Sequence, residues 1–93
     1  MVIGSCRIEL AFPGNDSLKG KRRLVKSLID RLRRKYNVAV AEVDQLDHWQ
    51  KATLGVACVT NDRRFACQVL SRVVNWVEGA GEGNLYDYQI EIW

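Results

Sequence analysis

Four segments of the chain carry the apolar pattern of β-strands. Val2–Phe12, Ala52–Thr60 and Leu85–Trp93 alternate between apolar and polar residues, which is the two-residue period of a strand with one packed face. The short run Val38–Val43 (VAVAEV) indicates a fourth strand. In the last segment, the alternation predicts that one face holds Tyr86, Tyr88, Ile90 and Ile92.

Two further segments repeat their apolar residues with the period of an α-helix. In Ser17–Lys35 these residues form one stripe: Leu18, Leu24, Val25, Leu28, Ile29 and Leu32. Ser17 or Asp16 can cap this helix by accepting a hydrogen bond from its first turn. The second helix begins after Asn61 or Asp62, repeats apolar residues every four positions, and ends at the glycine-rich segment that follows.

The order of these elements is βαββαβ. Two right-handed β-α-β crossovers interleave most simply as a four-stranded antiparallel sheet, with strand order 4-1-3-2 and both helices on one face. We therefore expect an α+β protein with a ferredoxin-like sandwich, formed by residues 1–93 as a single domain. Because this fold serves many unrelated functions, function has to be inferred from particular residues.

Positive charge is concentrated in the first helix. The segment Ser17–Lys35 holds nine of the 14 Lys and Arg residues and a single acid, Asp30, whereas the rest of the chain holds five basic and ten acidic residues. The net charge of +3 therefore conceals a polarised molecule. A helix face that is merely solvated usually carries both signs, paired at i, i+4. Because one acid cannot neutralise these cations, the pattern favours binding of an anion.

Seven cations of this helix are the candidate contacts to nucleic acid. They are Lys19, Lys21, Arg22, Arg23, Lys26, Arg33 and Arg34. A phosphate could also bind at the start of the helix, where free N–H groups and the helix dipole attract anions. The residues predicted for that phosphate site are Ser17, Lys19 and Lys21.

The predicted sheet lacks the aromatic residues of a base-stacking RNA platform. RNA-recognition motifs share the βαββαβ order and stack bases on aromatic residues of the first and third strands. Here Val2–Leu10 and Ala52–Thr60 contain no aromatic residue. Nucleic acid should therefore be bound through backbone phosphates and read by shape, with weak sequence preference and strong salt dependence.

Residues for catalysis or metal binding are sparse. Asp44 and Asp47 form the only cluster of titratable side chains near the single histidine, His48. To act as metal ligands or as acid and base, these residues would need a third partner and a cleft. Asp44 and Asp47 are better explained by hydrogen bonds to local N–H groups in a turn. Trp49 either packs at the edge of a helix or the sheet, or is exposed as a contact for a partner. We expect no catalytic residue, no metal and no cofactor.

Cysteine usage and hydropathy bear on the cellular setting. The three cysteines lack CxxC spacing and are expected to be buried free thiols in a reducing cytoplasm: Cys6, Cys58 and Cys67. The chain has no run of 18 apolar residues and no evident signal peptide. These features predict a cytoplasmic protein without a membrane partner.

The face of the sheet away from the helices offers an alternative function. It is expected to present small and charged residues such as Ser5, Arg7, Glu9 and Ala57. Ile3, Val59 and Trp93 would add apolar area. Such a face can contact water, a second copy of the chain or a small ligand. A homo-oligomeric regulatory or small-ligand-binding module is therefore the alternative to RNA binding.

Four segments resemble a known family: SLKGKR (Ser17–Arg22), VAEVD (Val40–Asp44), the pair Trp49-Gln50, and YDYQIEI (Tyr86–Ile92). Nearly the whole chain is similar to the YlxP-like bacterial family of small domains of unknown function. The resemblance implies a ferredoxin-like fold, a cytoplasmic bacterial setting and no established catalytic residues. Members of this family are commonly encoded beside genes for translation and ribosome maturation, so the resemblance also implies such a gene neighbourhood. We therefore expect a non-enzymatic module that binds structured RNA or a ribosomal subunit through the first helix.

Overall fold

The computed structural model describes every residue from Met1 to Trp93, and its six elements follow the predicted βαββαβ order. They are β1 (Val2–Ala11), α1 (Leu18–Lys35), β2 (Ala39–Asp44), β3 (Lys51–Thr60), α2 (Arg63–Gly79) and β4 (Asn84–Ile92). Neither helix combines the length and the apolar character needed to cross a membrane.

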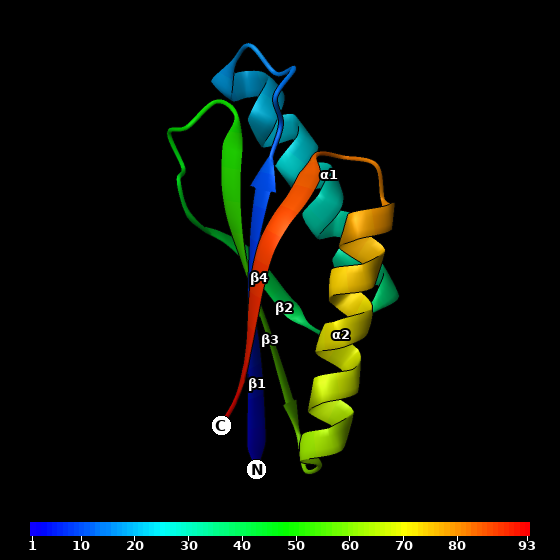
Figure 1. Ribbon diagram of the computed structural model, residues 1–93. Coiled ribbons are helices and arrows are strands. Elements are labelled where there is room, and N and C mark those ends of the chain that lie inside the picture. The colour runs from blue at the N-terminus through cyan, green and yellow to red at the C-terminus, as the bar shows by residue number, and fades with distance from the viewer.

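The four strands form one antiparallel sheet in the order β2-β3-β1-β4. This is the predicted order 4-1-3-2 described from the other edge, so the prediction is confirmed. Both helices lie on one face of the sheet (Figure 1). The opposite face, hereafter the outer face, is covered by no element, and the two termini lie together at one end of the molecule (Figure 1).

The core lies between the sheet and the two helices. Alternate residues of β1 and β3 point inward, and Ile8 and Leu54 among them are fully buried. The apolar stripes of the helices meet these strands through residues such as Leu28 of α1 and Leu70 of α2, which are also fully buried. Burial of each such side chain contributes about 1.5–3 kcal/mol to stability.

Both helices begin at capping residues that the sequence predicted. Ser17 Oγ accepts a hydrogen bond from the Gly20 N–H (3.0 Å), and Asp62 Oδ1 accepts one from the Arg64 N–H (2.9 Å). Each cap satisfies a backbone donor of the first turn that has no partner within the helix. The start of α1 is therefore fixed by its own side chains.

A β-bulge breaks the predicted alternation of β4. The register with β1 shifts after the pair Glu9–Asp87, so that Tyr86 is an extra residue in the strand. Its ring lies 5.8 Å from Nζ of Lys51, whose side chain belongs to the outer face. The prediction that Tyr86 shares a face with Tyr88 and the two isoleucines is therefore wrong, because a bulge reverses the alternation on one side of it.

Gly4 allows α2 to approach β1 closely. A Cβ atom on Gly4 would lie 2.9 Å from Leu70 Cδ1, 3.1 Å from Cys58 Sγ and 3.3 Å from Ala66 Cβ. Contacts this short require the neighbouring side chains to move, and close-packed cores resist such movement. The absence of a side chain at Gly4 therefore sets how near the helix packs to the sheet.

The cysteines differ in exposure. Cys6 and Cys58 are buried as predicted, and burial raises the pKa of the Cys6 thiol to about 11. Cys67 is exposed, so the prediction that it is buried is wrong. The reason is that the buried stripe of α2 passes through Ala66 and Leu70, which leaves the residue after Ala66 on the flank of the helix.

We predict that Gly4→Val destabilises the protein by about 1–3 kcal/mol, because the added side chain overpacks the contact between β1 and α2. Ser5→Val is the matched control, since Ser5 is the next residue of β1 and lies on the outer face. Its effect should stay within about 0.5 kcal/mol. Urea unfolding followed by circular dichroism measures both. Equal losses would show that close packing at Gly4 does not limit stability.

We also predict that a thiol reagent at pH 8 labels only Cys67 rapidly in the folded protein. Thiolate is the reactive species, and the raised pKa of Cys6 keeps that thiol protonated at this pH. Cys67→Ser should abolish the fast phase, whereas Cys58→Ser should leave it unchanged. Mass spectrometry of the labelled protein identifies the sites, and rapid labelling of Cys6 would contradict its burial.

Candidate nucleic-acid interface

Lys21, one of the predicted phosphate contacts, is fully buried beneath the β2–β3 connection. Its Nζ lies 2.9 Å from Glu42 Oε2 and donates to the carbonyl oxygens of Gln45 (2.8 Å), Leu46 (3.2 Å) and Lys51 (3.2 Å). The three carbonyl oxygens account for the three protons of the ammonium group, and the Glu42 carboxylate balances its charge. The predictions that Lys21 contacts nucleic acid and binds phosphate are therefore wrong.

The sequence contains a signal for this burial. Lys21 precedes Val25, Leu28 and Leu32 by four, seven and eleven residues, which is the spacing of one helix face, and all four side chains are buried. A lysine on the apolar stripe requires a buried acceptor. Its partner Glu42 lies on β2, so the spacing within the helix does not reveal which residue accepts.

The start of α1 is occupied by side chains of the chain itself. Ser17 Oγ is engaged as the cap of the helix. Asn15 Oδ1 lies against Gly20, where any Cβ atom would overlap it, so Gly20 accommodates Asn15. Of the three residues predicted for the phosphate site, Ser17 caps the helix, Lys21 is buried and Lys19 alone is exposed.

The β1–α1 turn and the β2–β3 connection are joined into one hydrogen-bonded unit, hereafter the tip. Asn15 Nδ2 donates to the carbonyl oxygens of Ser17 (2.6 Å) and Trp49 (2.7 Å). Gln50 Nε2 donates to the carbonyl oxygens of Pro13 (3.4 Å) and Asn15 (3.1 Å). The segments SLKGKR, VAEVD and Trp49-Gln50 thus meet around the buried lysine. The Trp49 indole stays 54% exposed, so of its two predicted environments the exposed one fits better.

Two of the three titratable side chains of the predicted cluster at the tip, Asp44 and His48, are engaged in local structure, whereas Asp47 is exposed and makes no side-chain hydrogen bond or ion pair. Asp44 accepts the Gln45 N–H (2.7 Å) and a hydrogen bond from Arg7 Nη2 (3.0 Å), and these two contacts lower its pKa. His48 Nδ1 accepts the Gln50 N–H (3.1 Å). No three His, Cys, Asp or Glu side chains gather closely enough to hold a metal ion. The hydrogen bonds of Asp44 and His48 stabilise the turns of the β2–β3 connection.

Six of the seven predicted nucleic-acid contacts are exposed on α1. At 3.6 residues per turn they form two neighbouring rows. The row beside β2, hereafter the inner row, holds Arg22, Lys26 and Arg33, and the row farther out, hereafter the outer row, holds Lys19, Arg23 and Arg34. Lys19, Arg22 and Arg23 make no ion pair and no side-chain hydrogen bond. Lys26 approaches Asp30 at 3.7 Å in an exposed pair, which neutralises little charge.

The inner row lines an open groove between α1 and β2. Arg22, Lys26 and Arg33 stand on one side, Val25 and Ile29 contribute apolar surface, and residues 40–42 of β2 form the other side. Arg33 Nη2 donates to the Val40 carbonyl oxygen (2.8 Å), which ties the row to the edge of the sheet. A line of cations beside a groove can follow the phosphates of a nucleic-acid backbone.

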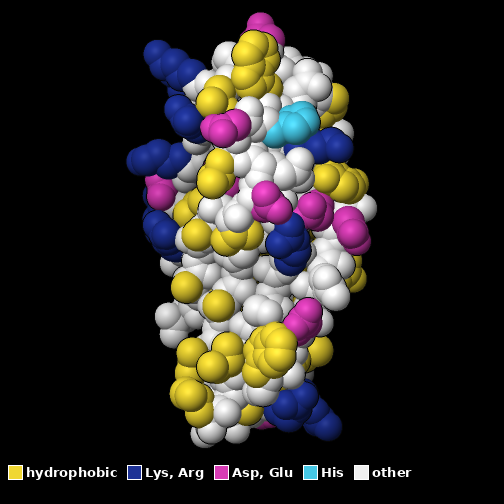
Figure 2. Space-filling view, turned by 90° about the vertical axis from the view of Figure 1, so that its left-hand side faces the viewer, with side chains coloured by type: hydrophobic (Ala, Val, Ile, Leu, Met, Phe, Trp, Pro, Cys, Tyr) yellow, Lys and Arg dark blue, Asp and Glu magenta, His cyan; other side chains and the backbone are white.

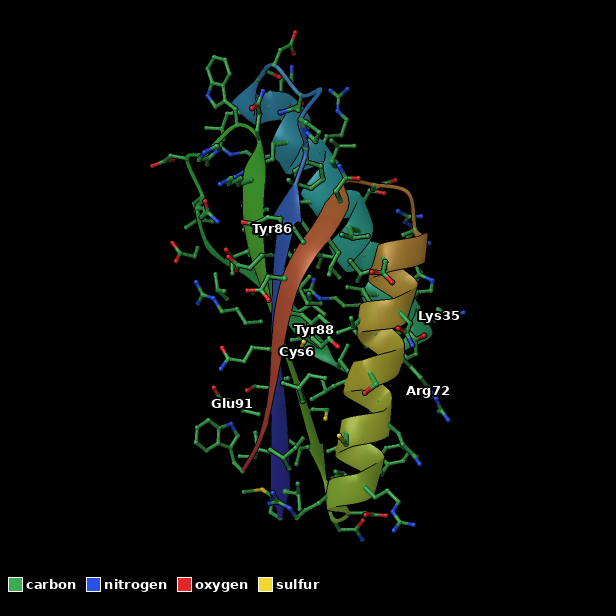
Figure 3. The ribbon with its side chains drawn as sticks, viewed as in Figure 1. Cys6, Lys35, Arg72, Tyr86, Tyr88 and Glu91 are labelled. Carbon is green, nitrogen blue, oxygen red and sulfur yellow. The ribbon has the colours of Figure 1, made fainter.

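The opposite flank of α1 faces α2, and Arg31 on this flank is used in packing. Arg31 Nη2 lies 2.9 Å from Glu82 Oε1, and its guanidinium lies 5.3 Å from the centroid of the Trp76 ring. The Tyr36 hydroxyl donates to the Arg72 carbonyl oxygen (3.5 Å). Lys35 and Arg72 lie on the helix side of the molecule (Figure 3). Arg31 is therefore less available to an anion than the exposed cations of the two rows.

The outer face of the sheet is divided along its length. Figure 2 shows hydrophobic side chains gathered toward one end of this face and charged side chains toward the other. The apolar end includes Ile3, Val59 and Trp93, which are 38%, 68% and 65% exposed. At the charged end Arg7 lies between Glu9 (3.4 Å) and Asp44 (3.0 Å), so its charge is already paired. Binding of a small ligand or second copy to this face stays a prediction.

Comparisons with known proteins cover nearly the whole chain. A protein-family profile described as "Protein of unknown function (DUF503)" matches residues 3–90. The uncharacterized protein YlxP of Bacillus subtilis (strain 168) is 31% identical over 81 residues, which are 87% of this chain and 88% of that protein. The de novo designed protein Foldit4 has a similar structure, with a TM-score of 0.54 at 15% identity over 99% of this chain and 94% of that chain. That likeness concerns the fold alone.

We predict that Lys21→Met destabilises the protein by about 3–5 kcal/mol, because it leaves the nearly buried Glu42 carboxylate without its charge partner. The backbone carbonyl oxygens that Lys21 now satisfies would also lose their donor. Urea unfolding measures the loss.

Lys19→Met is the control for Lys21→Met, since Lys19 is exposed on the same helix and should cost less than about 0.5 kcal/mol. Adding Glu42→Gln to Lys21→Met should recover part of the stability, because it removes the unpaired charge. If Lys21→Met were no more harmful than Lys19→Met, the buried pair would not support the fold.

Proposed function

The chain belongs to the DUF503 family, and we propose that it is a non-enzymatic module that binds the phosphate backbone of structured RNA. The observation that carries the proposal is the row of Arg22, Lys26 and Arg33 along the groove between α1 and β2. The outer row of α1 would contact neighbouring phosphates. A ribosomal RNA or subunit is the partner that best suits an RNA-binding module with this family resemblance.

Electrostatic repulsion within α1 supports this proposal. The exposed cations of the two rows have Asp30 as their one acidic neighbour on the helix, and it reaches only Lys26. Like charges held this close destabilise the free protein, and phosphates would relieve the repulsion while releasing their counterions. A helix face that is only solvated would be expected to carry more acids to pair with its cations.

The placement of aromatic residues supports readout of shape. β1 and β3 have no aromatic side chain, so the outer face offers no stacking platform of the RNA-recognition type. Long cationic side chains beside a groove instead suit phosphates, whose positions depend on the helical form of the RNA. The proposed partner is therefore folded RNA, and sequence preference should be weak.

The proposal also fits the wider interpretation of the chain. The element order, the sheet order and the placement of both helices on one face support a ferredoxin-like sandwich. Binding to RNA would place the protein in the cytoplasm, where free thiols such as Cys67 stay reduced.

We predict that the affinity for a fluorescent RNA hairpin falls steeply with salt and depends on the inner row. The triple variant Arg22→Gln/Lys26→Gln/Arg33→Gln should bind about 10–100-fold more weakly at physiological salt. The slope of log K against log salt should decrease by about 2–3, because three phosphate contacts are lost. Fluorescence anisotropy over a salt series measures both quantities.

The matched control for this triple is Lys51→Gln/Arg64→Gln/Arg72→Gln, which removes the same three charges away from the groove and should weaken binding less than about threefold. Circular dichroism establishes that both variants are folded. Equal losses of affinity in the two triple variants would show that binding depends on net charge and not on the groove. Binding that does not change with salt would exclude the electrostatic mechanism altogether.

A further inference from the structure

β4 is an edge strand whose outward backbone groups are largely unpaired. Ile3 and Trp93 exchange two backbone hydrogen bonds (3.3 and 2.7 Å), so Trp93 directs its N–H and C=O toward β1. In an antiparallel ladder this direction alternates along a strand. Beyond the bulge, Tyr88, Ile90 and Ile92 therefore direct their N–H and C=O groups away from the sheet.

The two edges of the sheet differ in protection. The edge of β2 lies against α1, and Arg33 binds its Val40 carbonyl oxygen. The straight part of β4, from Asp87 to Ile92, contains neither lysine nor proline, the residues that commonly block edge pairing. Its one outward group with a side-chain partner is the Ile92 carbonyl oxygen, which accepts a long hydrogen bond from Arg63 Nη2 (3.5 Å). An exposed strand of this kind is a template for another strand.

We propose that two copies of the chain pair through β4, antiparallel and with a two-fold axis at Ile90. In this register Ile90 faces its own counterpart, and Tyr88 faces Ile92 of the second copy, which gives apolar pairs on the helix side. On the outer side Gln89 faces Glu91 of the second copy, so no two like charges lie directly opposite each other. The pairing makes about six backbone hydrogen bonds, two for each pair of outward residues.

Charge selects this register over its neighbours. Outward backbone groups occur at every second residue of β4. The nearest alternative registers in which the two strands can pair are therefore shifted by two residues in either direction. A shift in one direction places Asp87 opposite Glu91, and a shift in the other places Glu91 opposite its own counterpart. Like charges directly opposite destabilise a pair of strands. Of these three registers, only the one centred on Ile90 avoids facing acids along the straight part of β4.

The proposed pairing leaves room for the helices. α2 packs over β1 and β4. In the paired sheet, the two copies of α2 are therefore separated by two to three strand spacings of about 4.8 Å each. That separation of about 10–14 Å equals or exceeds the 8–10 Å of packed helices. Glu91 points to the side of the sheet away from the helices, so the charge pairing is clear of them (Figure 3). The groove between α1 and β2 lies at the far edge of each copy and stays open, so the pairing does not depend on RNA binding.

Charge substitutions at Gln89 test the register by sedimentation without RNA. Gln89→Glu places acids opposite Glu91 twice per dimer and should raise the dissociation constant about tenfold, whereas Gln89→Lys should lower it about tenfold. Both shifts should shrink in 1 M salt, which screens charge. A wild-type chain that stays monomeric at several hundred micromolar, or equal shifts in the two variants, would overturn the proposal.

Ala57→Glu is the control for a dimer formed by the outer face. Ala57 is far from the β4 edge and pairs with Ser5 on β1, so this variant should leave a β4 dimer unchanged. Loss of dimer in Ala57→Glu alone would assign the contact to the outer face and overturn the proposal.

Amide hydrogen exchange of the wild-type protein gives an independent readout. The N–H groups of Tyr88, Ile90 and Ile92 should become protected as concentration rises, while Gln89 and Glu91 are protected throughout. Free exchange of the first three in the dimer would also overturn the proposal.

Discussion

The ion pair between Lys21 and Glu42 is the interaction on which the arrangement of this protein depends. A fully buried ammonium group is tolerated only where charge and hydrogen bonds replace water. Here the carboxylate comes from β2 and the carbonyl oxygens from the β2–β3 connection and the start of β3. One side chain of α1 therefore fixes the helix against β2 and holds the connection in place. The groove between α1 and β2 is a consequence of that contact.

The same connection also contains Gln45, which has a positive φ of 59° although it is not glycine. Such a conformation costs about 1–2 kcal/mol and persists when surrounding contacts determine it. Lys21 binds the Gln45 carbonyl oxygen, and Gln45 Nε2 donates to Thr53 Oγ1 (3.3 Å). The tip is thus a hydrogen-bonded structure built around a buried charge, and it projects the Trp49 indole into solvent.

Charge and strand pairing distinguish the two edges of the sheet, to which we assign different proposed roles. Along β2, α1 covers the edge and presents cations that have few acids to neutralise them. Along β4, backbone groups are exposed and the side chains are acidic, neutral polar or apolar, with no cation among them. An edge that binds phosphate and an edge that pairs with a second copy can operate together, because each lies on the far side of the sheet from the other.

The sequence by itself determined the elements, their order and the polarised charge. Hydrophobic periodicity is a local property, so alternation located the strands and the apolar stripe located α1. Residue type limited the caps to Ser17 or Asp16 and to Asn61 or Asp62, and the structure selected Ser17 and Asp62. Lys21 lay in line with Val25 on that stripe, but its partner Glu42 belongs to another element, and only the tertiary structure decided their pairing. The bulge at Tyr86 arises from the register between two strands. Side-chain pairs and exact register between distant segments are therefore what the sequence could not reveal here, although it did predict the strand order.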